Sequence, residues 1–459
     1  MRLRRATRYR FLALTAVLAL VLAACGDGRD DDDSSAGGGD DNGESEDGAG
    51  DGFEIDTVNC GVDPGTVEIT GGTIKFGTSL PQSGTYAAFS SILRGQQAYI
   101  DYLNAEKGGV DIGGTKYQIE LVAKDDAYAA EQTFSNVQSL VDDDDVFGLF
   151  NVVGTKNNLA IRDYVNETCV PNLLAATGSP AWGNTEYPWL LGTFLVPYPL
   201  EMVAFVDYLE NQKADATIAV LRADDDFGQS YSETLKALIA DTELTIVDEQ
   251  GYDPETGEVA SQVTSLAATN ADAFVLGATL LACPTALNEV AASGWQPITY
   301  MSGTCTSKTL MTIAGASGDA VLSVTPLMDP NDPQWADNDA MVLYKEKVAQ
   351  YAPADTDVGN GIVAYGWTAA AALEELLSRV EDPTRLGVMQ AARTLSDVSG
   401  IGLQLPDSTW SVGEDDWFLG ENFDLVQYVA ADGFFMVAGE RLDLPGETEE
   451  ITPENLINS

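Results

Sequence analysis

The sequence has no histidine among its 459 residues. This absence excludes Ser-His-Asp triads, Cys-His pairs, HExxH zinc sites and histidine proton shuttles. The Gly-x-Ser-x-Gly, P-loop and Gly-x-Gly-x-x-Gly fingerprints are missing as well. Carboxylates, by contrast, are too numerous for a catalytic pair to be singled out. We therefore expect a protein that is not an enzyme and that carries no cofactor or metal.

Basic residues are scarce: 23 Lys and Arg face 72 Asp and Glu, a formal net charge of −49. This charge repels phosphate and so excludes nucleic acid as a partner. It also disfavours tight self-association at low salt, so we expect a monomer. The acidity suits a saline medium, where screening weakens self-repulsion. The alternative is ordinary acidity, because residues 26–52 alone contribute 11 of the acids.

The N-terminus predicts export to the cell envelope. Five arginines precede an apolar run at residues 11–22, which is too short to span a bilayer comfortably. The run ends in Leu22-Ala23-Ala24-Cys25, which resembles a bacterial lipobox. We predict a lipoprotein signal peptide at 1–24 and acylation of Cys25. Several acyl chains on this cysteine would anchor the protein stably in a membrane. Ordinary cleavage beside an incidental cysteine is the alternative.

Residues 25–53 are predicted to be the lipidated cysteine followed by a disordered acidic tether. The stretch 26–52 holds nine glycines and a single arginine besides its acids, so it cannot bury a core. A calcium-binding tract is the rival interpretation, but the spaced ligands and closing glutamate of an EF-hand loop are absent. The predicted location is the outer face of the plasma membrane or the periplasm, with the protein held there by lipid.

Cysteine is rare, and four remain once Cys25 is set aside. An even number in an exported protein indicates disulfides, with three pairings open. Cys283 and Cys305 each follow a predicted strand end, and such ends meet at one edge of a parallel sheet, which makes them the natural pair. Cys60 and Cys169 are then left for each other. Metal ligation is the alternative, although no CxxC or histidine accompanies them.

From residue 73 onward the chain alternates predicted strands and helices. Apolar runs at 73–79, 117–123, 146–153 and 172–176 are separated by helical patterns such as 89–107 and 158–167. A similar series follows residue 193, with 45% hydrophobic residues overall to supply the core. This pattern predicts an α/β protein with two lobes, each a parallel sheet covered by helices.

In open α/β sheets, ligands bind at the carboxyl ends of the strands. The loops at these predicted ends are rich in Gly, Ser and Thr, and helices follow several of them. The free N–H groups at a helix N-terminus attract anions, so a carboxylate needs no arginine there. These loops are residues 79–85, 151–157, 176–179, 222–228, 277–281 and 302–306.

The sequence resembles the type I periplasmic-binding family, specifically the branched-chain amino-acid-binding proteins of ABC transporters. The resemblance covers roughly residues 70–440. It is carried by residues 76–84, 95–104, 121–126, 170–177, 223–229, 271–277 and 364–370. Each stretch alone is a weak indicator of the family. Their order along the chain, behind a lipobox and a tether, makes the whole set more specific.

This resemblance implies two Rossmann-like lobes joined by a three-strand hinge, with crossovers near 193–196, 323–330 and 400–410. The N-terminal lobe would comprise 54–194 plus about 328–402, and the C-terminal lobe 195–327 plus about 403–445. Residues 446–459 would be an acidic tail. A small amino-acid-like ligand would bind between the lobes, hinge closure would bury it, and the closed form would dock on an ABC permease. A ligand sensor for a signalling partner is the alternative function.

The resemblance also assigns ligand-binding roles. In the first loop, it implies that Ser83 contacts the ligand and that the ring of Phe89 covers it. It implies that the α-carboxylate or amine of the ligand is held by two segments: Gly154 with Thr155, and Ala175 with Ala176 and Thr177. In the second lobe, it implies that the ligand is contacted by Phe227, Glu258 and Thr304.

Each of these residues also has a plainer structural interpretation. Ser83 fits a turn, Phe89 and Phe227 fit the core, and Thr155 and Thr177 fit helix caps. Glu258 fits a solvated acid, and its alignment to the family's ammonium-binding acid slides by a residue or two. Phe227 also lacks the phenolic hydroxyl that many relatives have. Amides, urea, aromatic acids and other amino acids therefore stay open as ligands.

Overall fold

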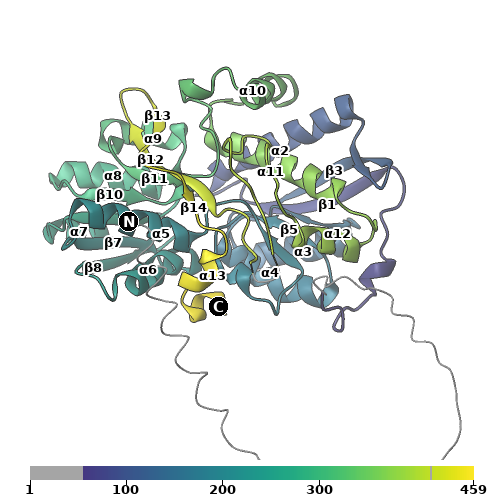
Figure 1. Ribbon diagram of the computed structural model, residues 1–459, viewed down its shortest axis with the longest axis horizontal. Helices are drawn as coiled ribbons and strands as arrows, with labels where there is room; N and C mark the ends of the chain where they lie inside the picture. The colour runs from purple at the N-terminus through teal and green to yellow at the C-terminus, as the bar shows by residue number, and fades with distance from the viewer. Residues whose placement is uncertain (1–54, 414–415, 459) are drawn as a thin grey trace, which may run out of the picture. The chain divides into compact units, whose positions relative to one another are not determined.

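The computed structural model describes residues 55–413 and 416–458 (Figure 1). The predicted signal peptide, Cys25 and the whole of the predicted tether lie outside these residues. In the described part, the chain forms two β-sheets, each covered by helices. None of the helices there has the length and apolar character that a membrane span requires.

The first sheet has the order β2-β3-β1-β4-β5-β6 and forms the first lobe. Its strands are parallel except β2, which pairs antiparallel with β3. Central strands are nearly continuous runs of buried residues, as expected where helices cover both faces. The strands are β1 (Thr73–Leu80), β2 (Val110–Ile112), β3 (Thr115–Asp125), β4 (Gly148–Phe150), β5 (Asn172–Ala175) and β6 (Leu190–Gly192).

Helices cover both faces of this sheet. Neighbouring β4 residues point to opposite faces, so Leu149 joins the core beneath α3 and α4 whereas Phe150 joins the main core with α2 and α11. Gly95 and Gly366 let α2 and α11 approach closely, since a Cβ on Gly366 would lie 2.0 Å from the Ile92 carbonyl oxygen. The helices are α2 (Ser90–Tyr102), α3 (Ala130–Asp142), α4 (Thr155–Thr168), α10 (Asp339–Tyr351), α11 (Gly361–Ser378) and α12 (Arg385–Arg393).

The second sheet has the order β13-β12-β11-β10-β9-β7-β8, with β14 paired to β12, and forms the second lobe. Its strands are β7 (Thr217–Ala223), β8 (Thr245–Tyr252), β9 (Ala273–Gly277), β10 (Ile298–Met301), β11 (Leu322–Thr325), β12 (Asn422–Val429), β13 (Phe434–Val437) and β14 (Leu442–Asp443). The strands up to β11 are parallel, and β12 to β14 add antiparallel pairs. Its helices are α5 (Tyr198–Gln212), α6 (Asp226–Ile239), α7 (Ala260–Ala268), α8 (Ala282–Ser293) and α9 (Lys308–Ala314).

Within the described residues, the chain passes between the two sheets in three segments. The first, 193–197, joins β6 to α5; the second, 326–338, joins β11 to α10; the third, 394–421, joins α12 to β12. The second and third are bonded to each other, because the Met328 amide donates to the Leu403 carbonyl oxygen (2.9 Å) and Leu327 forms a bridge with Gln404. This interlobe connection is the hinge of the fold.

Both expected disulfides are present. Cys60 is bonded to Cys169, which ties the segment before the first sheet to the C-terminal end of α4. Cys283 is bonded to Cys305, which ties the first turn of α8 to the turn after β10. The second bridge therefore joins two loops at the carboxyl edge of the second sheet. This agrees with the prediction that both cysteines follow strand ends at one edge.

The predicted acidic tail is partly folded. It forms α13 (Glu447–Ile451) and α14 (Glu454–Ile457), and Thr448 and Leu456 are buried. Both amide and hydroxyl of Thr448 donate to the carboxylate of Glu421, which precedes β12. The acids alone indicated a solvated segment, whereas α13 packs on α5 and α6 of the second lobe and α14 packs on residues 180–183, which follow β5 of the first lobe.

Some elements differ from the sequence-based expectation. The predicted strand 146–153 is shorter, because Asn151 adopts a left-handed conformation (φ 56°) and the chain turns there. The helix expected from residue 158 begins three residues earlier, after Gly154. Helix α12 and the short strands β2 and β6 were not predicted. A strand of three residues is too short to show a periodicity, whereas the buried Val388, Met389 and Ala392 of α12 do recur at helical spacing.

Candidate ligand-binding cleft

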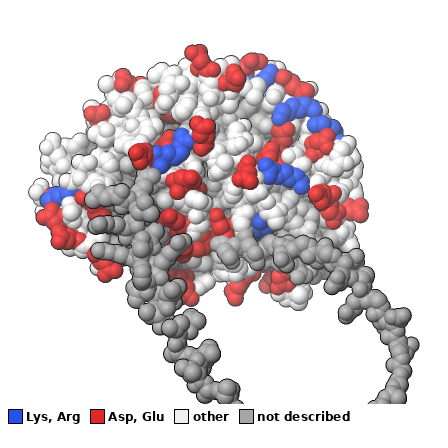
Figure 2. Space-filling model, viewed as in Figure 1, with Lys and Arg blue, Asp and Glu red and all other residues white. Residues whose placement is uncertain are grey.

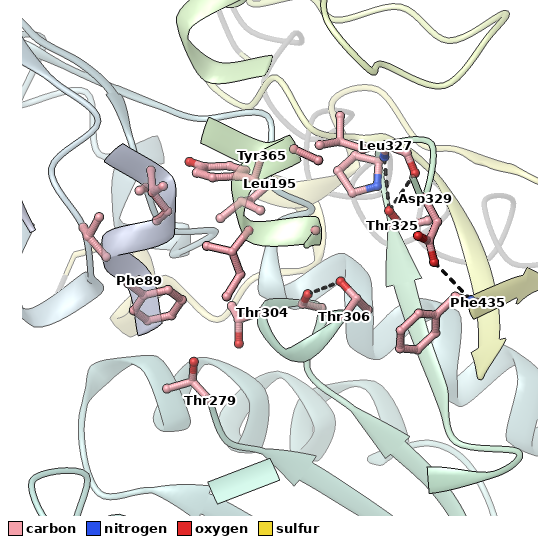
Figure 3. A pocket seen from close by; sticks show the side chains of 18 of the residues that line it. Phe89, Leu195, Thr279, Thr304, Thr306, Thr325, Leu327, Asp329, Tyr365 and Phe435 are labelled. Atoms are coloured by element: carbon pink, nitrogen blue, oxygen red, sulfur yellow. Dashed lines mark hydrogen bonds between the residues drawn. The ribbon is translucent and has the colours of Figure 1, made fainter. Parts of the chain in front are cut away.

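A cleft lies where the carboxyl ends of the two sheets face each other (Figure 3). Both lobes and the hinge contribute to its walls. Tyr365 and Leu195 lie on one side of it, and Thr279 and Thr304 lie on the other. The lobes also touch at the rim, where the Thr85 hydroxyl donates to the carbonyl oxygen of Glu255 across the cleft (3.0 Å). This hydrogen bond therefore joins the two lobes at one rim of the cleft.

The start of α4 supplies the polar end of the cleft. Gly154 precedes this helix and has no side chain to cap it, so the first N–H groups of α4 have no side-chain cap. Thr155, the first helical residue, lines the cleft, and its hydroxyl shares a hydrogen bond with that of Thr177 (2.7 Å). The Tyr198 hydroxyl donates to Thr177 from the second lobe (3.3 Å). This arrangement of N–H and O–H groups suits an anion.

Gly154 is required at its position for two reasons. Its φ of 102° is one that L-residues with side chains rarely adopt. In addition, a Cβ here would lie 2.6 Å from Cε2 of Tyr128. The glycine therefore lets the ring of Tyr128 lie directly against the start of α4.

A buried carboxylate positions Tyr128. Ala127 and Tyr128 both adopt left-handed backbone conformations, with φ of 48° and 66°. Asp126 Oδ1 accepts the Tyr128 amide (2.8 Å), and its Oδ2 accepts the hydroxyls of Ser79 (2.8 Å) and Thr133 (3.0 Å). Burial raises the pKa of Asp126, while these hydrogen bonds oppose that rise. The network holds the turn that directs Tyr128 into the cleft.

Aromatic rings close the same end. Tyr128 stacks on Tyr86 with 4.0 Å between ring centroids, and Tyr86 lies beside Phe89. From the second lobe, Phe227 packs edge-on against Tyr198 at 5.0 Å. The polar end of the cleft is thus enclosed by rings from both lobes.

The hydroxyl of Thr279 is a buried polar group of the second lobe at the cleft. It follows β9, lines the cleft and is 6% exposed, and its hydroxyl has no hydrogen-bond partner in the protein. A buried hydroxyl without a partner costs stability. Its orientation toward the cleft therefore marks it as a contact for a bound molecule.

Glu201 lies behind this wall, in a small recess beside Thr304. Its Oε2 accepts the Tyr300 hydroxyl (2.7 Å) and the Gly303 amide (3.0 Å). Burial without a cationic partner raises the pKa of Glu201 to about 7. Glu201 therefore fixes the 303–305 turn against the hinge.

The structure brings six of the predicted site residues to the cleft wall: Phe89, Gly154, Thr155, Ala176, Phe227 and Thr304. Four others do not line it. Ser83 lies in an exposed turn, where its amide donates to Asp125 (3.2 Å). Ala175 is buried within β5, and Thr177 lies behind Thr155. Glu258 is exposed just before α7.

Several cleft residues were not predicted from sequence. Leu195 comes from the first hinge segment, Tyr198 from the start of α5 and Tyr365 from α11, and only the packing of the lobes brings them together. Tyr128 lies just beyond the strand that the sequence predicts at 117–123, in a segment to which no role was assigned. Tyr365 lies within a stretch that carried the family resemblance, so it is the one that sequence comparison could have identified.

Solved structures of similar fold include three binding proteins with different ligands in their names. A branched-chain amino acid ABC transporter protein from Thermus thermophilus with bound valine is 17% identical, with a TM-score of 0.71 over 82% of this chain and 97% of that one. A fatty acid ABC transporter substrate-binding protein from Thermomonospora curvata is 19% identical (TM-score 0.71; 84% and 96%). A solute-binding protein from R. palustris in complex with benzoate is 19% identical (TM-score 0.66; 82% and 97%).

These similarities establish the two-lobed fold of type I periplasmic binding proteins. The family model for periplasmic binding proteins matches residues 73–432, most of the chain. No curated protein matches the sequence. The chain belongs to the periplasmic binding protein family.

Proposed function

We propose that this protein is an extracytoplasmic solute-binding lipoprotein that captures a small organic ligand and delivers it to an ABC import permease. Cys25 carries the lipid, and residues 25–53 form the tether that lets the binding domain reach the permease. The N-terminal lobe (54–194 with about 328–402) and the C-terminal lobe (195–327 with about 403–445) close on the ligand. The protein works as a monomer and has no catalytic activity.

One observation carries this proposal: a cleft with walls from both lobes has an uncapped helix N-terminus at one end. A ligand that contacts both lobes stabilises the closed arrangement, because it favours the state in which both sets of contacts form. Phe89, Gly154, Thr155, Ala176, Phe227 and Thr304 contact the ligand, and Thr177 supports Thr155 from behind. The ABC transporter proteins of similar fold support the permease as partner.

A thermal-shift screen tests the proposal. The chain from residue 26 is heated in about 0.1 M and about 1 M salt with amino acids, amides, urea and organic acids in turn. A ligand at 100 times its Kd adds about 2.7 kcal/mol of stability, which raises the melting temperature measurably. A shift with one class of solute is expected. A folded sample that responds to none of these solutes would contradict the proposal.

A further inference from the structure

The cleft is longer than its polar end. Figure 3 shows it running from Phe89 past Tyr365 and Leu195 to Leu327 and Phe435. Phe435 lies on β13, in the antiparallel hairpin that extends the second sheet, and is 6% exposed. A small amino acid at the start of α4 would leave this far part of the cleft unfilled.

The far part of the cleft offers an apolar surface. Its wall includes Leu195, Leu327, Met328, Ile362 and Phe435. The threonine hydroxyls among them already donate to the protein: Thr306 to the Gly303 carbonyl oxygen (2.6 Å) and Thr325 to that of Leu327 (2.9 Å). A bound group at this end therefore meets mainly carbon, apart from Asp329 and from Lys308, whose ammonium group donates to Asn331 Oδ1 (3.2 Å).

The positions of the carboxylates also disfavour an amino acid as the ligand. Among the described residues that line the cleft, Asp329 is the only acid, and it lies at the far end beside Thr325 and Phe435 (Figure 3). Its oxygens accept the Asn331 amide (2.8 Å) and the Phe435 amide (3.2 Å). It thus lies at the opposite end of the cleft from Phe89 (Figure 3), and its oxygens are already hydrogen-bonded within the protein.

The acids nearer the polar end do not reach the cleft. Asp225 does not line it and caps α6 by accepting the Gly228 amide (3.1 Å). Glu258 is exposed, and Glu201 is held in its own recess by Tyr300 and Gly303. An α-ammonium group beside a carboxylate bound at α4 would therefore meet no carboxylate among the described residues that line this end of the cleft, and burying an ammonium group without acceptors for its N–H groups is unfavourable.

We propose that the ligand is a monocarboxylate with an extended alkyl or arylalkyl body and no α-ammonium group. This inference rests on the proposed binding function and specifies its ligand. The carboxylate accepts from the start of α4, from the Thr155 hydroxyl and from the unpartnered hydroxyl of Thr279. The apolar body passes Leu195 and Ile362 and ends against Phe435.

A matched pair of ligands tests the missing ammonium group. Hexanoate and norleucine have the same carbon chain and differ only in the α-ammonium group. We expect hexanoate to bind at least tenfold more tightly by calorimetric titration of the chain from residue 26 at 0.15 M and 1 M salt. Tighter binding of norleucine or leucine would overturn the inference and leave the binding function intact.

A chain-length series tests the extended body. From butanoate to octanoate, each buried methylene contributes about 0.8 kcal/mol, or about a fourfold lower Kd. We expect affinity to rise along the series. A flat series would overturn the inference. Binding of amides or urea without binding of any carboxylate would also overturn the inference about the ligand and leave the binding function intact. Failure of every solute to bind would contradict both the inference and the binding function.

Two variants locate the body of the ligand. Phe435→Ala should weaken octanoate binding about 15-fold, the equivalent of two lost methylene contacts, and change butanoate binding little. Ile362→Trp should block the passage and likewise affect only the longer ligand, so the test does not depend on either variant alone. Met436→Ala, on the exposed side of the same strand, is the matched control. Equal losses for both ligands, or none, would contradict this placement.

Discussion

Gly154 shows how a single residue shapes the cleft, since it combines a left-handed φ with direct contact to Tyr128. We expect Gly154→Ala to lower the unfolding free energy by about 1–3 kcal/mol for the backbone strain, and to weaken ligand binding by displacing Tyr128. Gly71→Ala is the control, because Gly71 has a φ of 76° and no neighbour within 4 Å of a Cβ. Chemical denaturation and titration measure both effects. Equal destabilisation of the two variants, with unchanged affinity, would refute the role of the Tyr128 contact.

Glu201 makes stability depend on pH. Its pKa is raised from 4.5 to about 7 by burial, so the folded protein holds this proton more tightly than the unfolded chain does. The resulting stabilisation is complete below about pH 4.5 and is lost as the pH rises through about 7. Glu201→Gln keeps an acceptor for Tyr300 and Gly303 without the charge. We therefore expect its stability relative to the wild type to increase between pH 5 and pH 8.

Urea unfolding at both pH values measures this difference. The exposed Glu258→Gln variant controls for the loss of one negative charge. A Glu201→Gln variant whose stability relative to the wild type is the same at pH 5 and pH 8 would show that Glu201 does not titrate differently in the folded state.

At the scale of elements, the two disulfides have different roles. Cys283–Cys305 holds the turn that contains Thr304, whereas Cys60–Cys169 lies at the opposite end of α4 from Gly154. Removing either bridge by paired Cys→Ala substitutions should cost about 2–5 kcal/mol. Only loss of Cys283–Cys305 should also weaken ligand binding. Titration of both double variants measures this, and an equal affinity in the two would contradict it.

The sequence was sufficient to predict the main elements and the pairing of Cys283 with Cys305. Alternating apolar runs and helical patterns reveal parallel sheets, and strand ends on one edge place these cysteines together. The loops predicted at the strand ends contain Gly154, Thr155 and Thr304, and the family resemblance assigned these three residues to the ligand.

The remaining features depend on long-range packing. The left-handed turn at Tyr128 is set by the buried Asp126 and its partners Ser79 and Thr133, which come from separate elements. Phe435 reaches the cleft only through the pairing of β13 with β12. Neither local composition nor periodicity contains this information, so the far end of the cleft could not be predicted.

At the scale of the whole molecule, acidity is the dominant property. Figure 2 shows acidic side chains spread over the face in view, with basic ones fewer and in separate places. Exposed like charges repel one another, and salt screens the repulsion over about 10 Å at 0.1 M and about 3 Å at 1 M. We expect the melting temperature to rise between about 0.1 M and 1 M KCl. Equal stability at the two concentrations would argue against adaptation to a saline medium.

The central claim is that one organic ligand binds in the cleft at the start of α4. It is tested most directly by calorimetric titration of the wild type and of Thr155→Val, which keeps the side-chain shape but removes the hydroxyl, with the ligand that shifts the melting temperature most. The account predicts one molecule bound per chain and an affinity about tenfold lower in the variant, which loses a hydrogen bond to a charged group. Equal affinity for the two proteins, or more than one site per chain, would contradict it.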